Sequence, residues 1–149
     1  MTANTLPIFT DIPKNSWGLQ GTSSLVTSAI TATTPSTYDG TTGTYLVFTA
    51  GSVGSFVSKL VCEAGGTNAA GVLRVFINNG SSTATPANNV LYLQYSLPAT
   101  TAAAASATAH IEIPLNIQLQ SGYRLYAALG SASNPIGGGW TVTAIAGDY

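Results

Sequence analysis

His110 and Glu112 are the first residues of this sequence whose types and spacing suggest chemistry. His110 is the single histidine, so a Ser-His-Asp or Cys-His catalytic arrangement would have to use it. Both residues lie in the stretch HIEIPL, which alternates polar and apolar side chains as a half-buried strand does. The alternation points Ile111, Ile113 and Leu115 toward a core and the two polar side chains outward. We therefore interpret His110 as an exposed strand histidine.

The remaining candidate groups are too few or too scattered for a predicted site. The chain has five carboxylates, which are Asp11, Asp39, Glu63, Glu112 and Asp148. Glu63 and Glu112 are the obvious pair for a glycosidase, but nothing in the sequence brings them together. A zinc site needs about four ligands, and DGTTGT (39–44) lacks the alternating acids of a calcium loop. GGTNAAG (65–71) precedes a strand pattern, which disfavours a phosphate-binding loop. We predict no catalytic residue, no metal site and no cofactor.

The charge content of the chain points away from ionic partners. Charged residues make up 6% of the 149 residues, against about 25% in a typical soluble domain. Four basic and five acidic residues give a net charge of −1. No basic stripe exists to neutralise phosphates, so we expect neither nucleic acid nor an anionic membrane as a partner. A neutral surface loses little solvation when another protein covers it.

The cysteine content and the first residues bear on where the chain is made. Cys62 stands alone at an apolar position of FVSKLVCEA, where we expect a buried, inert thiol. One cysteine cannot form an internal disulfide, which favours synthesis in a reducing cytoplasm. MTANTLPIFTDIPK does not read as a secretory signal, and no apolar stretch approaches the length of about 18 residues expected of a membrane span.

The elements that would position these residues are predicted to be strands. Period-two alternation rich in β-branched and aromatic residues recurs along the chain, punctuated by turn signals such as Asn79-Gly80. The candidate strands cover residues 24–32, 44–50, 55–64, 71–78, 90–96, 108–115, 123–130 and 140–147. About eight short strands at this spacing predict an all-β, antiparallel β-sandwich with a jelly-roll topology as a good candidate. In GVLRVFIN, Leu73, Val75 and Ile77 face one way, while Arg74 and Phe76 face the other.

Two segments fall outside this pattern. ATTAAAASATAH (99–110) contains helix-favouring alanines, but Pro98 and the Thr and Ser interruptions favour a loop or edge segment. Residues 1–22 contain two prolines, which predicts an extended N-terminal arm ahead of a sandwich domain at 23–149. The arm carries the apolar anchors Leu6, Ile8, Phe9 and Trp17. The arm lies either across its own sandwich or on a neighbouring subunit.

Three classes of function remain. A structural subunit would use its neutral surface, its arm and its long neutral loops (79–89 and 99–109) to contact other protein. A carbohydrate-binding or adhesive module would use aromatic stacking, although strand aromatics usually belong to a core. Its candidate platforms are Trp17, Tyr92, Tyr95, Tyr123, Tyr126, Trp140 and Tyr149. Of these, Trp140 is expected to open the last strand and pack into the sandwich. A small enzyme is the third class and has the least support.

The composition of several stretches of the chain, and the order in which they occur, resemble those of a known group of proteins. The stretches TYLVFTAGSVGSFVSKLVCEAGGTNAAGVLRVFINNG (44–80), GYRLYAALG (122–130) and GWTVTAIAGDY (139–149) are similar to small virion structural proteins of tailed bacteriophages, most of all capsid decoration (cement) proteins. The resemblance lies in Thr/Ala/Gly-rich strands, a Pro-aromatic arm and an acidic-aromatic end, and no single motif is diagnostic.

That resemblance implies a role and a place. It implies a β-sandwich that sits on the capsid exterior after synthesis in the host cytoplasm, commonly as a homotrimer. The partner would be the major capsid protein, whose neighbouring copies it clamps, and no catalytic residues carry over. Leu6, Ile8, Phe9 and Trp17 would form the interface with the shell or with a sister subunit. The alternative is a carbohydrate-binding or adhesive module in a head fibre or tail.

Overall fold

The computed structural model describes residues 37–130 and 139–149, together with the backbone of residues 12–16. These residues form eight strands and one short 3₁₀ helix, η1. In chain order they are β1 (Ile12–Ser16), β2 (Thr44–Thr49), β3 (Ser55–Ala64), β4 (Gly71–Asn78), η1 (Pro86–Asn88), β5 (Asn89–Leu97), β6 (His110–Leu119), β7 (Arg124–Gly130) and β8 (Trp140–Asp148). Within the described part of the chain, no helix is long and apolar enough to cross a bilayer.

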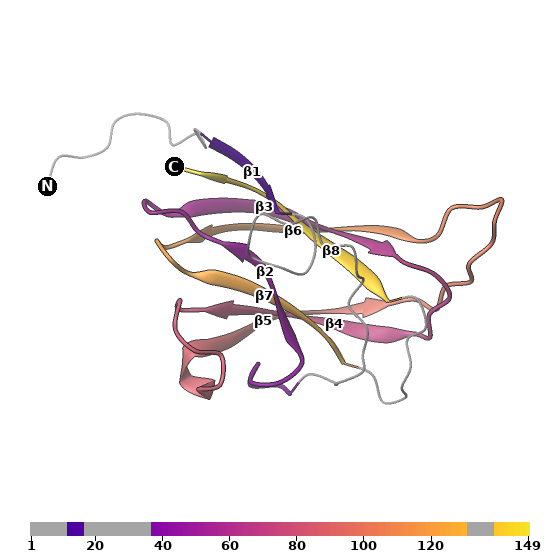
Figure 1. Ribbon diagram of the computed structural model, residues 1–149, viewed down its shortest axis with the longest axis horizontal. Helices are drawn as coiled ribbons and strands as arrows, with labels where there is room; N and C mark the ends of the chain where they lie inside the picture. Colours follow the sequence, from indigo (N-terminus) through magenta and orange to yellow (C-terminus); the bar gives the residue numbers. More distant parts are fainter. Residues whose placement is uncertain (1–11, 17–36, 131–138) are drawn as a thin grey trace, which may run out of the picture.

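The strands form two antiparallel sheets of four strands each. One sheet has the order β1-β8-β3-β6 and the other the order β2-β7-β4-β5. Successive strands mostly alternate between the two sheets, and among the described strands only β4 and β5 follow each other within one sheet as a hairpin. This order is the double Greek key of an eight-stranded jelly roll. Figure 1 shows the two layers, with β1, β3, β6 and β8 above β2, β7, β5 and β4. The predicted all-β sandwich is therefore confirmed.

The strand predictions agree closely with the structure wherever it describes the chain. Every predicted strand from 44–50 onward is present, and β3 and β4 have the predicted bounds. The strand predicted at 24–32 lies outside the described residues. Within the predicted arm, residues 12–16 form β1, which pairs with β8 from Ile12–Asp148 to Ser16–Ala144. The four predicted anchors of the arm, Leu6, Ile8, Phe9 and Trp17, lie outside the described residues.

The core lies between the sheets and consists of the apolar side chains that point inward from alternate positions of the strands. Leu73 and Val75 from β4 and Ile113 from β6 are buried, as the alternation predicts. Cys62 is fully buried among them, and Trp140 opens β8 with its ring in the core. Among the described residues, the indole N–H of Trp140 has no hydrogen-bond partner.

The outer face of β4 is buried as well. Arg74 and Phe76 point away from the core but are 9% and 1% exposed. Residues 37–43, which we call the cover segment, lie against them. The guanidinium Cζ of Arg74 is 4.1 Å from the centroid of the Tyr38 ring, and a Cβ on Gly40 would lie 2.9 Å from Cδ1 of Phe76. Alternation predicted the orientation of these side chains, but it did not reveal the segment that covers them.

Asp39 gives the cover segment its shape. Its Oδ1 accepts hydrogen bonds from the Thr37 hydroxyl at 2.5 Å, from the Thr41 hydroxyl at 2.8 Å and from the Thr41 N–H at 3.1 Å. These bonds, with the Thr37 hydroxyl contributing most, lower the pKa of Asp39. Asn89 of β5 then donates to the Asp39 carbonyl at 3.1 Å. The segment is thus tied both to itself and to the sheet beneath it.

Candidate functional site

Two neighbouring strands, β3 and β6, bring four titratable residues together on one face. In the pairing of β3 with β6, Glu63 lies opposite His110 and Val61 lies opposite Glu112. Because alternate residues share a face, Glu63, His110 and Glu112 project outward from the sheet together with Lys59. We call these four residues the ion-pair row. The outward orientation predicted for His110 and Glu112 is confirmed.

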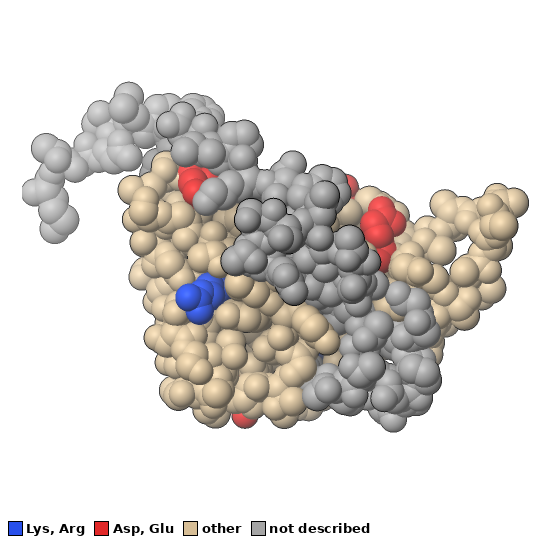
Figure 2. Space-filling view, in the orientation of Figure 1, with Lys and Arg blue, Asp and Glu red and all other residues tan. Residues whose placement is uncertain are grey.

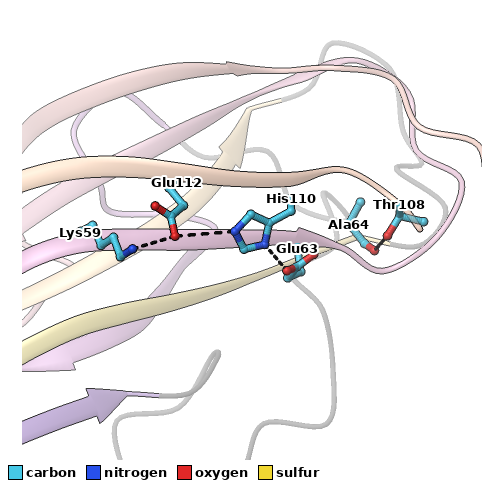
Figure 3. A network of polar contacts seen from close by, with 6 residues as sticks. All are labelled: Lys59, Glu63, Ala64, Thr108, His110 and Glu112. Carbon is cyan, nitrogen blue, oxygen red and sulfur yellow. Dashed lines mark hydrogen bonds and ion pairs between the residues drawn. The ribbon is translucent and has the colours of Figure 1, made fainter. Parts of the chain in front are cut away.

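The ion-pair row is a chain of contacts on the surface (Figure 3). The Lys59 ammonium donates to Oε1 of Glu112 at 2.7 Å, and the same oxygen lies 3.7 Å from Nε2 of His110. On the other side of the ring, Nδ1 of His110 contacts Oε1 of Glu63. The side chains of His110, Glu63 and Glu112 are about half exposed. Such exposed pairs are screened by water, so each adds little to stability.

The electrostatics of the row oppose its use as a catalytic base. The hydrogen bond with Glu63, followed by the charge of Glu63, raises the pKa of His110. The hydrogen bond from Lys59, followed by its charge, lowers the pKa of Glu112. Both ring nitrogens of His110 face carboxylate oxygens, and these oxygens favour the imidazolium form. A general base needs one ring nitrogen with a free lone pair, and this arrangement works against that state.

Cys62 and the carboxylates add no further chemistry to the row. Cys62 is adjacent to Glu63 in sequence but points into the core, and burial, followed by the charge of Glu63, raises its pKa to about 12. A thiol in that state is neither a nucleophile nor a metal ligand at neutral pH. Among the described residues, no group of three or more His, Cys, Asp and Glu side chains is placed to hold a metal ion.

A second feature is the connection between β5 and β6, residues 98–109, which we call the projecting loop. It crosses from one sheet to the other and extends well beyond the strands in Figure 1. It contains no helix, so the predicted loop is confirmed. Residues 101–107 are all exposed, none is charged, and five of them are alanine. Figure 2 shows this projection without a charged side chain.

A network of hydrogen bonds holds the base of the projecting loop. Asn68 is 3% exposed, and its backbone exchanges hydrogen bonds with Thr100 at 3.0 and 2.9 Å. Its side-chain amide donates to the Thr100 hydroxyl at 3.0 Å and to the Gly139 carbonyl at 3.1 Å, while its Oδ1 accepts from the Gly139 N–H at 2.7 Å. Because a buried amide with several partners is costly to disturb, Asn68 fixes one side of the base.

The other side of the base is fixed by two threonines. The Ala102 N–H donates to the Thr67 hydroxyl at 2.9 Å, and the Thr108 hydroxyl donates to the Ala64 carbonyl at 2.8 Å (Figure 3). At the tip, Ala103 and Ser106 form an isolated antiparallel bridge. The sequence did not reveal these contacts, because GGTNAAG suggested only a glycine-rich turn and Asn68 bonds to a segment 32 residues away.

The other long neutral loop, residues 79–88, is folded back on itself by asparagines. Asn78 donates to Oδ1 of Asn89 at 2.8 Å, and Asn79 donates to Oδ1 of Asn88 at 3.1 Å. Asn89 also donates to the Thr83 carbonyl at 2.8 Å. Consecutive asparagines are thus paired across the base of the hairpin. The two loops share a neutral composition, but the asparagine pairs fold residues 79–88 back on themselves, whereas the projecting loop extends well beyond the strands in Figure 1.

The aromatic residues proposed as stacking platforms divide into three groups. Trp140 is fully buried, as expected, and Tyr123 and Tyr126 are half-buried, as is Tyr149. Tyr92 and Tyr95 remain exposed, both on β5. Trp17 lies outside the described residues.

Comparison with known proteins adds no further evidence on function. No family model, curated protein or solved structure matches the chain.

Proposed function

We propose that this chain is a non-enzymatic virion structural protein, a capsid decoration (cement) subunit that binds the outside of a phage head. In this role it bridges neighbouring major capsid proteins and associates with itself as a homotrimer. The single observation that carries the proposal is the projecting loop. Its base is held by hydrogen bonds, and its tip, residues 101–107, is uncharged, rich in methyl groups and exposed to a binding partner.

The physics of association favours such a tip as a contact surface. Covering apolar groups contributes about 25 cal/mol per Å², and alanine loses no side-chain entropy when it is covered. No charge in the tip has to be desolvated. The bonds of Asn68, Thr67 and Thr108 order the base before binding, which lowers the entropy that association must overcome.

The fold is compatible with this role but does not select it. Jelly rolls build both viral capsid proteins and lectin domains. The low charge of the whole chain and the resemblance to phage decoration proteins favour the first. In this proposal Leu6, Ile8, Phe9 and Trp17 give the arm a second anchor on the shell or on a sister subunit. The ion-pair row then acts as a solvated patch on a surface that carries little other charge.

A charge placed at the tip tests the proposal directly. Ala104→Glu puts a carboxylate at the centre of the uncharged tip, where covering it costs at least about 1–2 kcal/mol. We expect its binding to heads of the encoding phage to weaken about tenfold or more, measured by co-sedimentation of the purified chain with heads. Ser121→Glu in the β6–β7 turn is the matched control, because Ser121 is also exposed and lies outside both long neutral loops.

One outcome contradicts this function, and a second contradicts the role of the tip in it. If the unaltered chain does not sediment with the heads, the decoration role is wrong. If Ala104→Glu and Ser121→Glu bind equally well, the tip is not the contact, and deletion of residues 1–20 then tests the arm in the same assay.

The carbohydrate-binding alternative has one observation in its favour, the exposure of Tyr92 and Tyr95 on β5. Aromatic rings on a strand can stack against sugar rings. A glycan array with the purified chain tests this alternative, and binding that is lost in Tyr92→Ala would favour it over the decoration role.

A further inference from the structure

Strand β5 (Asn89–Leu97) forms an outer edge of the sheet β2-β7-β4-β5. One side of its backbone pairs with β4 over the whole strand, from Gly71–Leu97 to Asn78–Asn89. The opposite side has no strand partner among the described residues. A row of unpaired N–H and C=O groups of this kind is a template for another strand.

The other outer strands carry features that discourage pairing. β6 has the charged residue Glu112 and also Pro114, which lacks an N–H, and Asn116 departs from strand geometry with φ of 51°. β1 is five residues long and contains Pro13 and Lys14, and β2 is six residues long with a register shift. Charges, prolines and short or irregular strands are the usual ways of blocking an edge.

β5 has few of these protections. Its nine residues, NVLYLQYSL, include no charge and no proline. One register shift, which leaves Tyr92 as the extra residue, is its only irregularity. Along the same strand Val90 is 62% exposed, Tyr92 is 42% exposed and Tyr95 is 37% exposed. The edge therefore presents main-chain hydrogen-bonding groups beside uncovered apolar side chains.

We propose that β5 pairs with the β5 strand of a second copy of this chain, antiparallel across a two-fold axis. The two four-stranded sheets would then join into one continuous sheet. Backbone groups supply the bonds, and the exposed side chains of β5 supply apolar contact. The contact is isologous, because both copies use the same residues.

The absence of charge favours a second copy as the occupant. Near a two-fold axis each side chain lies opposite itself or a close neighbour, so any charge would face a like charge and oppose pairing. β5 contains none. The same arrangement at β6 would bring Glu112 of each copy toward the other. This association requires no capsid and does not depend on the proposed function.

The number of copies tests the proposal, because a two-fold contact in which every copy takes part requires an even number. We expect sizing with mass detection of the purified chain to give a dimer, or a hexamer where the two-fold contact joins two copies of the proposed homotrimer. Ser96→Lys places a charge on β5 and should halve the measured mass. Gln118→Lys on β6 is the control, since Gln118 is also exposed on an outer strand and should leave the mass unchanged. A monomer or a simple trimer for the unaltered chain would overturn the proposal, as would equal effects of the two lysines.

Cross-linking locates the contact independently of any change in mass. Cysteines introduced singly at positions 90, 92, 94 and 96 should give disulfide-linked dimers in highest yield at the position nearest the axis. A disulfide requires Cα atoms within about 7 Å, which antiparallel partners meet only close to that axis. Cys62 does not interfere, because it is buried. Yields no higher than that of Gln118→Cys would overturn the proposal.

Discussion

Charged side chains on the outer faces of the two sheets differ in how far water reaches them. On the sheet β1-β8-β3-β6, Lys59, Glu63, His110 and Glu112 pair with one another in contact with water. On the sheet β2-β7-β4-β5, Arg74 is buried beneath the cover segment. Both sets occupy the outward phase of an alternating strand. The comparison shows that strand phase decides which way a side chain points, whereas the connecting segments decide whether water reaches it.

The niche of Arg74 shows how a buried guanidinium is accommodated. Its guanidinium packs against the ring of Tyr38, and its Nε donates to Oε1 of Gln94 at 3.4 Å. A Cβ on Gly130 would lie 2.6 Å from Nη1, so a glycine on β7 makes the space. A cation against an aromatic ring contributes up to about 2 kcal/mol when desolvated. The ion-pair row needs no comparable niche, because its side chains are in contact with water.

The largest expected effect on the free energy of unfolding comes from a comparison of two variants, each of which removes an aromatic ring from one of the two outer faces. Phe76→Ala deletes a ring that is 1% exposed under the cover segment, and we expect it to lower the free energy of unfolding by about 3–5 kcal/mol. Phe56→Ala deletes a half-buried ring on β3, outside the core cluster, and should lower it by less. Urea denaturation of both variants measures the difference. Equal losses would mean that the cover segment adds nothing to the burial of Phe76.

Substitutions of two glycines also test how closely the cover segment packs, with a smaller expected loss of stability. Gly40 in the cover segment and Gly122 in the β6–β7 turn have φ of 73° and 76°, where a side chain is strained. A Cβ on Gly122 meets nothing within 4 Å, whereas one on Gly40 approaches Phe76. Gly122→Ala should therefore lower the free energy of unfolding by about 1 kcal/mol from backbone strain alone.

Gly40→Ala should exceed that loss by about 1–3 kcal/mol, because the added methyl also displaces Phe76 or the cover segment. Thermal or urea unfolding of the two variants, measured side by side, isolates the contact from the shared strain. If Gly122→Ala proves as costly as Gly40→Ala, the close packing of the cover segment is not a source of stability.

Local pattern made the strands of this fold predictable. In β6 the apolar Ile111, Ile113 and Leu115 alternate with polar partners, so the strand, its core face and the exposure of His110 all followed from the sequence. Cys62 and Trp140 were placed in the core for the same reason. Each of these predictions depends on neighbours within one strand.

What the sequence did not reveal depends on contacts between distant segments. The meeting of Glu63 with His110 depends on the register between β3 and β6, which alternation leaves open. Asn68 gave no local sign that it would hold the projecting loop. β1 was expected as part of an arm because Pro13 is uncommon in strands, yet proline is tolerated on an edge strand. Register, capping of loops and edge position are tertiary properties.

The smallest expected effect concerns the exposed row, and it is a change in titration rather than in stability. The pKa of His110 should lie above its ordinary value of 6.5, mainly because Oε1 of Glu63 accepts a hydrogen bond from its Nδ1–H. A raised pKa means that the stabilisation is complete below pH 6.5 and is lost as pH rises through the folded pKa. For Glu112, whose pKa is lowered from 4.5, stabilisation is present above pH 4.5 and is lost as pH falls through the folded pKa.

The row therefore stabilises the fold most between pH 4.5 and 6.5, with a small amplitude because its side chains are half exposed. NMR titration reads His110 without ambiguity, since it is the only histidine. Glu63→Gln should move its pKa down toward 6.5, and Glu112→Gln should move it down by less. Asp39→Asn, on the cover segment of the other sheet, should leave the titration unchanged. If Glu63→Gln leaves the pKa in place, the row is not a coupled set of charges, and the two outer faces differ only in how far water reaches them.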